Sequence, residues 1–182
     1  MKTALDPRHT TRQDAVQSLF AWAFHKQPLA NQLAKDVVKN ITLIDDITTH
    51  SAPEFTIDRI NHIDLAILRL AIYELVVLHK EPPKVIIDEA VELAKEFGGD
   101  TSPAFINGAL GKVFSSPARI NRIIADTLGV EDKNLTDDAN LRTDLNADDI
   151  EVADLLEKLE IDKGTSINTV RDILDYVEDH TI

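Results

Sequence analysis

The sequence predicts an all-α protein made of two helical bundles. Apolar residues recur at spacings of three and four along most of the chain, and no segment alternates as a β-strand would. Among 182 residues, 43% are hydrophobic and only six are glycine, which fits packed cores. Residues 1–114 carry a net charge of −3, whereas residues 115–182 carry −10. We therefore predict one domain over residues 1–115 and a second, acidic domain over residues 116–182.

The first three helical stretches follow from apolar periodicity. The first is predicted from Thr10 to about His25, with Thr10 and Gln13 as a capping box. A second is predicted over residues 29–48 and a third over residues 56–80. The second half of the third stretch is apolar almost all round, which is typical of a helix at the centre of a bundle.

Proline and glycine mark the next boundaries. Pro83 fits the first turn of a helix over residues 84–97, and Gly98 with Gly99 is expected to end it in the left-handed conformation. A further helix is predicted to begin at Ser102. Asn107 and Gly108 interrupt its helix propensity, which close packing against a neighbouring helix explains.

The second domain is predicted to contain three helices. Ser116 caps the first, which runs to residue 128, so the linker between the domains is about two residues long. A polar loop follows over residues 131–146. The next helix is predicted over residues 148–161, with Asp148 and Glu151 as a capping pair and Gly164 as its end. The last helix is predicted over residues 167–179.

Three blocks of the first domain occur in the order and at the spacing of a known family. They are RINHIDLAILRLAIYEL at 59–75, PKVIIDEAVELAKEFG at 83–98 and FING at 105–108, preceded by RQDAVQSLFAW at 12–22. Over roughly residues 8–114 the chain resembles the NusB family of transcription antitermination factors. The resemblance implies a helical bundle that binds boxA-type RNA together with NusE, a ribosomal small-subunit protein, in the transcription elongation complex. It also implies a contribution to ribosomal RNA synthesis.

The resemblance also implies an RNA-binding surface. Its predicted members are Lys2, Arg8, His9, Arg12, Phe20, Ser102 and Phe105. Guanidinium groups neutralise phosphates and aromatic rings stack on bases, which suits single-stranded RNA. Core packing is the alternative for Phe20 and Phe105, and a solvated helix start is the alternative for Arg8 and Arg12.

A partner-binding surface is implied along the central helix. Its predicted members are Asp64, Arg69, Tyr73 and Glu74. The Asp64 carboxylate would accept hydrogen bonds from a basic partner. The alternative for Asp64 is a charge at the exposed end of a buried helix.

The second domain resembles an acyl carrier protein over most of residues 118–180. Asp149 replaces the serine that carries phosphopantetheine, and a carboxylate cannot form that phosphodiester. The stretch between Leu159 and Ile167 is also too short for the usual third helix. Asp148 and Asp149 have a simpler role as helix caps. A sharper hypothesis is that the acidic domain docks on a basic surface, either of a partner or of the RNA-binding domain itself, where it would be autoinhibitory.

Catalytic and metal-binding motifs are absent from the sequence. There is no cysteine, HExxH, P-loop, GxGxxG or GxSxG, so we expect neither an enzyme nor a cofactor or metal. No apolar run is long enough to be a signal or membrane segment, so we expect a cytoplasmic protein. The main alternative function is a protein-interaction scaffold that has lost RNA binding. An RNA-binding arm of a methyltransferase and an active acyl carrier are weaker alternatives.

Overall fold

The computed structural model describes residues 6–26, 28–51, 53 and 56–180. The regular secondary structure of these residues is helical, and they contain no β-strand, only an isolated bridge between Asn140 and Thr169. The chain divides into two compact units, Met1–Leu110 and Gly111–Ile182. The all-α prediction is confirmed, and the domain limits of 1–115 and 116–182 stay a prediction. Lys2 lies outside the described residues.

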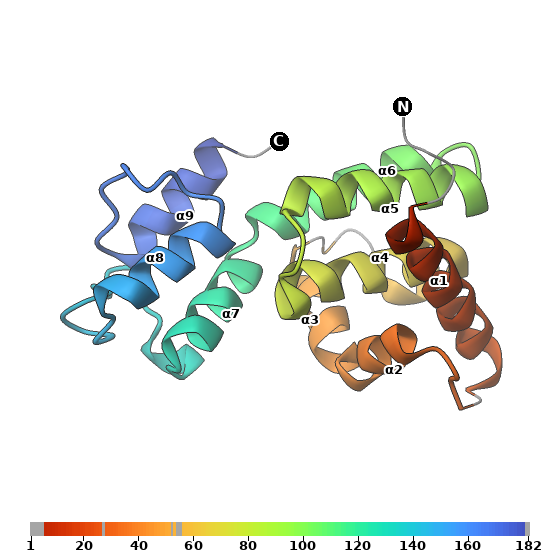
Figure 1. The fold of residues 1–182 in the computed structure, drawn as a ribbon, viewed down its shortest axis with the longest axis horizontal. Helices are drawn as coiled ribbons and strands as arrows, with labels where there is room; N and C mark the ends of the chain where they lie inside the picture. The colour runs from red at the N-terminus through yellow and green to blue at the C-terminus, as the bar shows by residue number, and fades with distance from the viewer. Residues whose placement is uncertain (1–5, 27, 52, 54–55, 181–182) are drawn as a thin grey trace. The chain divides into compact units, whose positions relative to one another are not determined.

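The first unit is organised around helix α4. Its elements are α1 (Pro7–His25), α2 (Gln32–Lys39), α3 (Ile41–Ser51), η1 (Ile57–Arg59), α4 (His62–Tyr73), η2 (Glu74–Leu78), α5 (Pro83–Phe97) and the start of α6 (Ser102–Ser115). Helices α1, α2, α3 and α5 all pack against α4 (Figure 1). Ile67, Leu70 and Ile72 of α4 are almost fully buried, which confirms a central helix.

Helix α1 begins earlier than the sequence predicted. Asp6 is its N-cap, its carboxylate accepts from the Arg8 amide at 2.9 Å, and Pro7 occupies the first turn. The predicted capping box of Thr10 and Gln13 is therefore wrong, because both residues already lie inside the helix.

The helix predicted over residues 29–48 is two helices. Asn31 caps α2, its side-chain oxygen accepting from the Ala34 amide at 2.9 Å. The chain then leaves helical geometry at Asn40, and α3 starts at the next residue. The apolar periodicity did not reveal this break, because the apolar face continues across it and a single non-helical residue barely shifts the pattern.

Helix α4 ends in a wider π-helical turn, η2. His79 closes this turn in the left-handed conformation, with φ 47°, and its amide donates to the Glu74 carbonyl. Such turns often occur at functional sites. Here the turn begins at Glu74, whose side chain accepts hydrogen bonds from Arg12 of α1.

Gly98 ends α5 in an extended conformation, with φ −90° and ψ −175°, so the predicted left-handed stop is wrong. The glycine is needed for space instead. A Cβ at this position would lie 2.5 Å from Ser102 Cβ and 2.7 Å from the Ala94 carbonyl oxygen. The close approach of the α6 start therefore excludes a side chain.

The second unit contains α7 (Pro117–Leu128), η3 (Asp132–Asn134), α8 (Asp149–Lys158) and α9 (Val170–Asp179), with α8 and α9 both packed on α7. The Ser116 hydroxyl accepts from the Arg119 amide, and Asp148 and Glu151 form a capping box, as predicted. Helix α8 ends before Glu160, which has φ 58°, and not at Gly164 as predicted.

Arg119 is an unusual core residue of the second unit. It is fully buried, its Nη1 donates to the Phe114 carbonyl at 2.8 Å, its Nε and Nη2 have no hydrogen-bond partner, and its guanidinium lies 4.5 Å from the Phe114 ring centroid. Burial lowers the pKa of Arg119 to about 10. The guanidinium is therefore charged at neutral pH inside an apolar core.

Two negative findings apply to the residues that the structure describes. None of these helices is long and apolar enough to span a bilayer. Within the same residues, no group of three or more histidine, aspartate or glutamate side chains is arranged to hold a metal ion.

Candidate nucleic-acid interface

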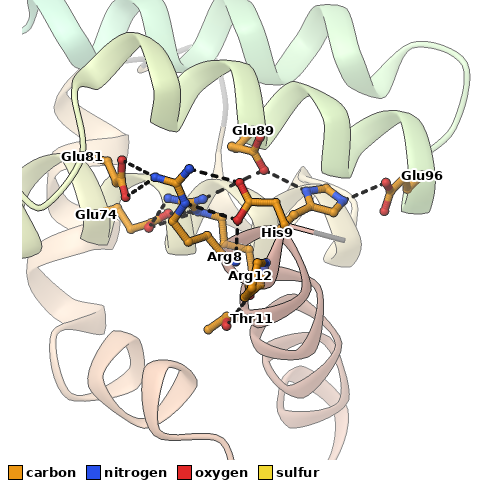
Figure 2. Close-up of polar contacts among 10 residues, drawn as sticks. Arg8, His9, Thr11, Arg12, Glu74, Glu81, Glu89 and Glu96 are labelled. Atoms are coloured by element: carbon orange, nitrogen blue, oxygen red, sulfur yellow. Dashed lines mark hydrogen bonds and ion pairs between the residues drawn. The ribbon is translucent and has the colours of Figure 1, made fainter. Parts of the chain in front are cut away.

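The basic start of α1 is held by glutamates from η2, α5 and the segment between them. We call Glu74, Glu81, Glu89 and Glu96 the carboxylate cluster. Figure 2 shows these side chains converging on Arg8, His9 and Arg12. Among the cations that the sequence assigned to RNA, the described ones, Arg8, His9 and Arg12, are thus already paired within the protein.

Arg12 and Glu74 form a buried ion pair. Arg12 Nε donates to both Glu74 oxygens at 3.1 and 3.0 Å, and Nη2 donates to Oε1 at 2.8 Å. Burial alone would lower the pKa of Arg12, but the Glu74 hydrogen bonds and charge outweigh it and raise the pKa overall. A predicted RNA-binding residue and a predicted partner-binding residue therefore contact each other in the interior.

His9 bridges two members of the carboxylate cluster. Its Nδ1 lies 2.8 Å from Glu89 Oε2, and its Nε2 lies 2.9 Å from Glu96 Oε1. The hydrogen bond with Glu89 raises the pKa of His9, and Glu96 adds to this effect against the opposing effect of burial. Protonated His9 donates to both carboxylates and ties α1 to α5.

Arg8 is the most exposed cation of this group. Its side chain is 61% exposed, and its guanidinium donates to Glu81 at 3.0 and 3.2 Å and to Asp6 at 3.1 Å. These hydrogen bonds raise the pKa of Arg8. Exposed pairs of this kind exchange readily for other anions, so Arg8 can still meet a phosphate.

An aromatic surface lies at the other end of α1. It consists of Phe20, Phe24 and His62, and the two phenylalanines are 36% and 53% exposed. The Phe24 ring centroid is 5.1 Å from that of Phe20 and 4.8 Å from that of His62, both edge-on. Phe24 and His62 lie outside the predicted set. The four-residue spacing of Phe20 and Phe24 on one helix is the sequence signal that points to them.

Ser102 and Phe105 differ in accessibility. Ser102 is 3% exposed, and its hydroxyl accepts from the Gly99 amide at 3.0 Å, so it stabilises the start of α6. Phe105 is half-buried and lines a pocket together with Asp64. The fold thus brings a residue assigned to RNA beside one assigned to a protein partner.

The predicted partner-binding residues of the central helix are mostly buried. Asp64, Tyr73 and Glu74 are 6–8% exposed, and burial raises the pKa of the Tyr73 hydroxyl. Arg69 pairs with Asp45 through two hydrogen bonds at 2.9 and 2.8 Å, which join α4 to α3. Their role toward a partner stays a prediction.

The second unit exposes an acidic helix start. The Asp149 side chain is 92% exposed and lies 3.0 Å from Arg142. Ile150, the next residue, is 79% exposed, although it is a large apolar side chain. Both residues stand at the first turn of α8.

Comparisons with known proteins match the first unit. The NusB family model matches residues 25–115. The transcription antitermination protein NusB of Streptomyces avermitilis is 37% identical over 129 residues, covering 58% of this chain and 90% of that protein. The protein of the same name from Geobacillus kaustophilus is 37% identical over 122 residues, covering 58% and 94%.

A solved structure has the same fold. T. maritima NusB superposes with a TM-score of 0.58 at 27% identity, covering 64% of this chain and 96% of that chain. The matching part of the chain therefore spans nearly the full length of these relatives. On the family match and these identities, the chain belongs to the NusB family.

Proposed function

We propose that this chain is a cytoplasmic transcription antitermination factor, not an enzyme, that binds boxA-type single-stranded RNA together with NusE. Membership of the NusB family and the names of its relatives support this function. The observation that carries the RNA-binding part is the aromatic surface of Phe20, Phe24 and His62. Exposed rings bind unstacked bases, whereas a structural role would bury them. A contribution to ribosomal RNA synthesis belongs to the same proposal.

The main RNA contact is placed at the aromatic surface because the arginines are engaged elsewhere. Arg12 lies in a buried pair with Glu74, and releasing it would leave a buried carboxylate unpaired. Arg8 remains available as an exposed phosphate contact. Lys26, whose ammonium lies 3.6 Å from the Trp22 ring centroid, adds a cation near the end of α1.

RNA binding tests the proposal directly. Anisotropy with a labelled boxA RNA is measured at low and moderate salt, with and without purified NusE. We expect binding that NusE strengthens and that falls as salt rises, because phosphate contacts release counterions. Phe24→Ala, which removes a ring of the aromatic surface, should weaken this binding. Val85→Ala, which shortens another exposed apolar side chain of the first unit, is its matched control. Absence of binding under all these conditions would remove the proposal.

A protein scaffold without RNA binding is the second candidate. The carboxylate cluster favours it, because its glutamates neutralise the cations at the start of α1. The same titration discriminates the two functions. A scaffold binds NusE but not the RNA, whether NusE is present or absent.

For the second unit we propose an acyl-carrier-like fold with a docking role and no carrier activity. The order of α7, a long loop, α8 and α9 supports the fold. Asp149 stands in place of the serine and is paired with Arg142, so no phosphopantetheine is expected. The exposed Ile150 beside the acidic helix start suits a basic partner surface with an apolar hollow.

One double variant separates the docking hypotheses. Asp149→Lys with Ile150→Ser changes the exposed start of α8 in the full chain. If the acidic unit were autoinhibitory, the variant would bind RNA more tightly than the wild type. If the unit docks on a basic partner protein, as proposed here, RNA affinity stays constant and partner binding weakens. Incubation with coenzyme A and a phosphopantetheinyl transferase is expected to add no mass.

A further inference from the structure

We propose that a pocket beside the first turn of α4 holds one unstacked RNA base, preferably guanine, whose N–H edge donates to the Asp64 carboxylate. The inference rests on the proposed RNA binding and adds base selectivity to it. The pocket has a volume of about 260 Å³ and is lined in part by Arg59, Asn61, Asp64, Thr101 and Phe105. This volume is close to the lower end of small-ligand sites, about 300 Å³.

Asp64 presents an unsatisfied hydrogen-bond acceptor in this pocket. Asp64 is 8% exposed, and its Oδ1 is buried without a hydrogen-bond partner. A buried acceptor without a donor is costly, so the free protein leaves an interaction unmade in this pocket. Asp64 also lies in the first turn of α4, where the helix dipole stabilises a carboxylate. The Asp64 Oδ1 atom therefore lacks an N–H donor in the free protein.

Arg59 decides which donor fits. Its side chain lines the same pocket, and within the described part of the chain it is not engaged in an ion pair. A lysine or arginine of a protein partner would meet repulsion from Arg59 while approaching Asp64. A nucleotide satisfies both groups, because its base carries N–H donors and its phosphate carries negative charge.

Guanine matches the carboxylate best among the four bases. Its Watson–Crick edge places the ring N1–H and the exocyclic amino group side by side, whereas the other bases present an acceptor next to each donor. Phe105 contributes an aromatic wall, which suits a planar ring. Asn61 immediately precedes His62 of the aromatic surface, so the pocket and that surface share the start of α4.

The test uses the full chain and short labelled single-stranded RNAs of equal length. One RNA is oligouridine, and the others carry a single guanosine or a single adenosine. We expect the guanosine RNA to bind wild type about tenfold or more tightly than oligouridine, the discrimination of one good base contact. Asp64→Asn is expected to remove this preference, so that the guanosine RNA and oligouridine bind with equal affinity. Asp58→Asn removes the same charge from an exposed neighbour and should change neither affinity.

A second variant guards against a folding defect in Asp64→Asn. Thr101 is exposed and lines the pocket, so Thr101→Trp introduces a bulky ring into the pocket and leaves Asp64 itself unchanged. It should abolish the guanosine preference in the same way. Thermal melts of each variant show whether it is folded.

The possible failures are distinguishable. If no RNA binds, the proposed function fails and the pocket inference fails with it. If RNAs bind without a guanosine preference, or if Thr101→Trp keeps the preference, only the pocket inference is overturned. If Asp64→Asn weakens NusE binding while the preference persists, the carboxylate meets a basic protein side chain and the base assignment is wrong.

Discussion

The Arg12 guanidinium and the Glu74 carboxylate bind each other through Nε and Nη2 in the interior of the first unit. The pair joins α1 to the turn that follows α4, across 62 residues of sequence. Each group is desolvated, so each depends on the other to satisfy its charge.

Breaking this pair is expected to destabilise the protein strongly. Arg12→Met leaves Glu74 buried and unpaired, which costs about 3–5 kcal/mol. The double variant Arg12→Met with Glu74→Leu should recover much of this loss. Urea unfolding measures both, and Arg8→Met, which removes an exposed cation, should change little. A single variant as stable as the wild type would contradict the buried pair.

Stability is expected to depend on pH through His9. The pKa of His9 in the folded protein is raised above its ordinary value of 6.5. The stabilisation that protonated His9 contributes is therefore complete below pH 6.5. It is lost as pH rises through the folded pKa. The stability difference between wild type and His9→Asn should therefore be larger at about pH 6 than at about pH 8. Equal differences at the two pH values would show that protonation of His9 does not couple to folding.

Gly98 is expected to reject even a methyl group. Gly98→Ala forces a Cβ against Ser102 Cβ and the Ala94 carbonyl oxygen and should cost about 1–3 kcal/mol. Gly99→Ala is the matched control, since a Cβ there meets nothing within 4 Å. Thermal melting of the two variants compares them, and equal melting temperatures would refute the close approach of α6.

Arg119→Met is expected to leave the second unit at least as stable as before. The guanidinium is fully buried, two of its nitrogens have no hydrogen-bond partner, and well-packed apolar residues often replace buried charges without loss. The Phe114 carbonyl loses its hydrogen-bond donor in this variant, and this loss of free energy partly offsets the benefit of removing the buried charge. The free energy of chemical unfolding shows whether Arg119→Met stabilises or destabilises the protein. A loss of more than about 2 kcal/mol would mean that the charge itself stabilises this core.

Phe24→Ala is expected to weaken binding of single-stranded RNA. One base stacked on an aromatic side chain contributes about 1–3 kcal/mol, which corresponds to roughly five- to 150-fold in affinity. Anisotropy with boxA RNA measures the change, and Val85→Ala should leave it unaltered. An unchanged affinity would place the RNA away from the aromatic surface.

The sequence predicted correctly those features that depend on interactions between residues close together in the chain. The apolar stretch of α4, the Ser116 cap and the Asp148–Glu151 capping box depend on neighbouring residues and are confirmed. The predicted helix start was wrong where two capping motifs lie close together in the sequence. Thr10 fits a capping motif, but Asp6 followed by Pro7 fits one as well and starts the helix earlier.

The candidate site could be predicted only in part, because long-range packing arranges it. Glu81, Glu89 and Glu96 are 73 to 87 residues away from their partners in α1, and no spacing along the chain reveals these contacts. The same holds for the unpartnered Asp64 oxygen, which depends on how the start of α4 meets α6. The residue types in the sequence therefore indicate which chemical groups are present, but not which of these groups contact one another.

The carboxylate cluster also affects how fast a polyanion can arrive. Its negative charges cancel the outward field of Arg8 and Arg12, so the start of α1 cannot attract RNA from a distance. Encounter is then expected at the ordinary diffusive rate of about 10⁵–10⁶ M⁻¹s⁻¹, without the acceleration that a basic patch provides. For this chain the lifetime of the complex, rather than the speed of its formation, would set the affinity.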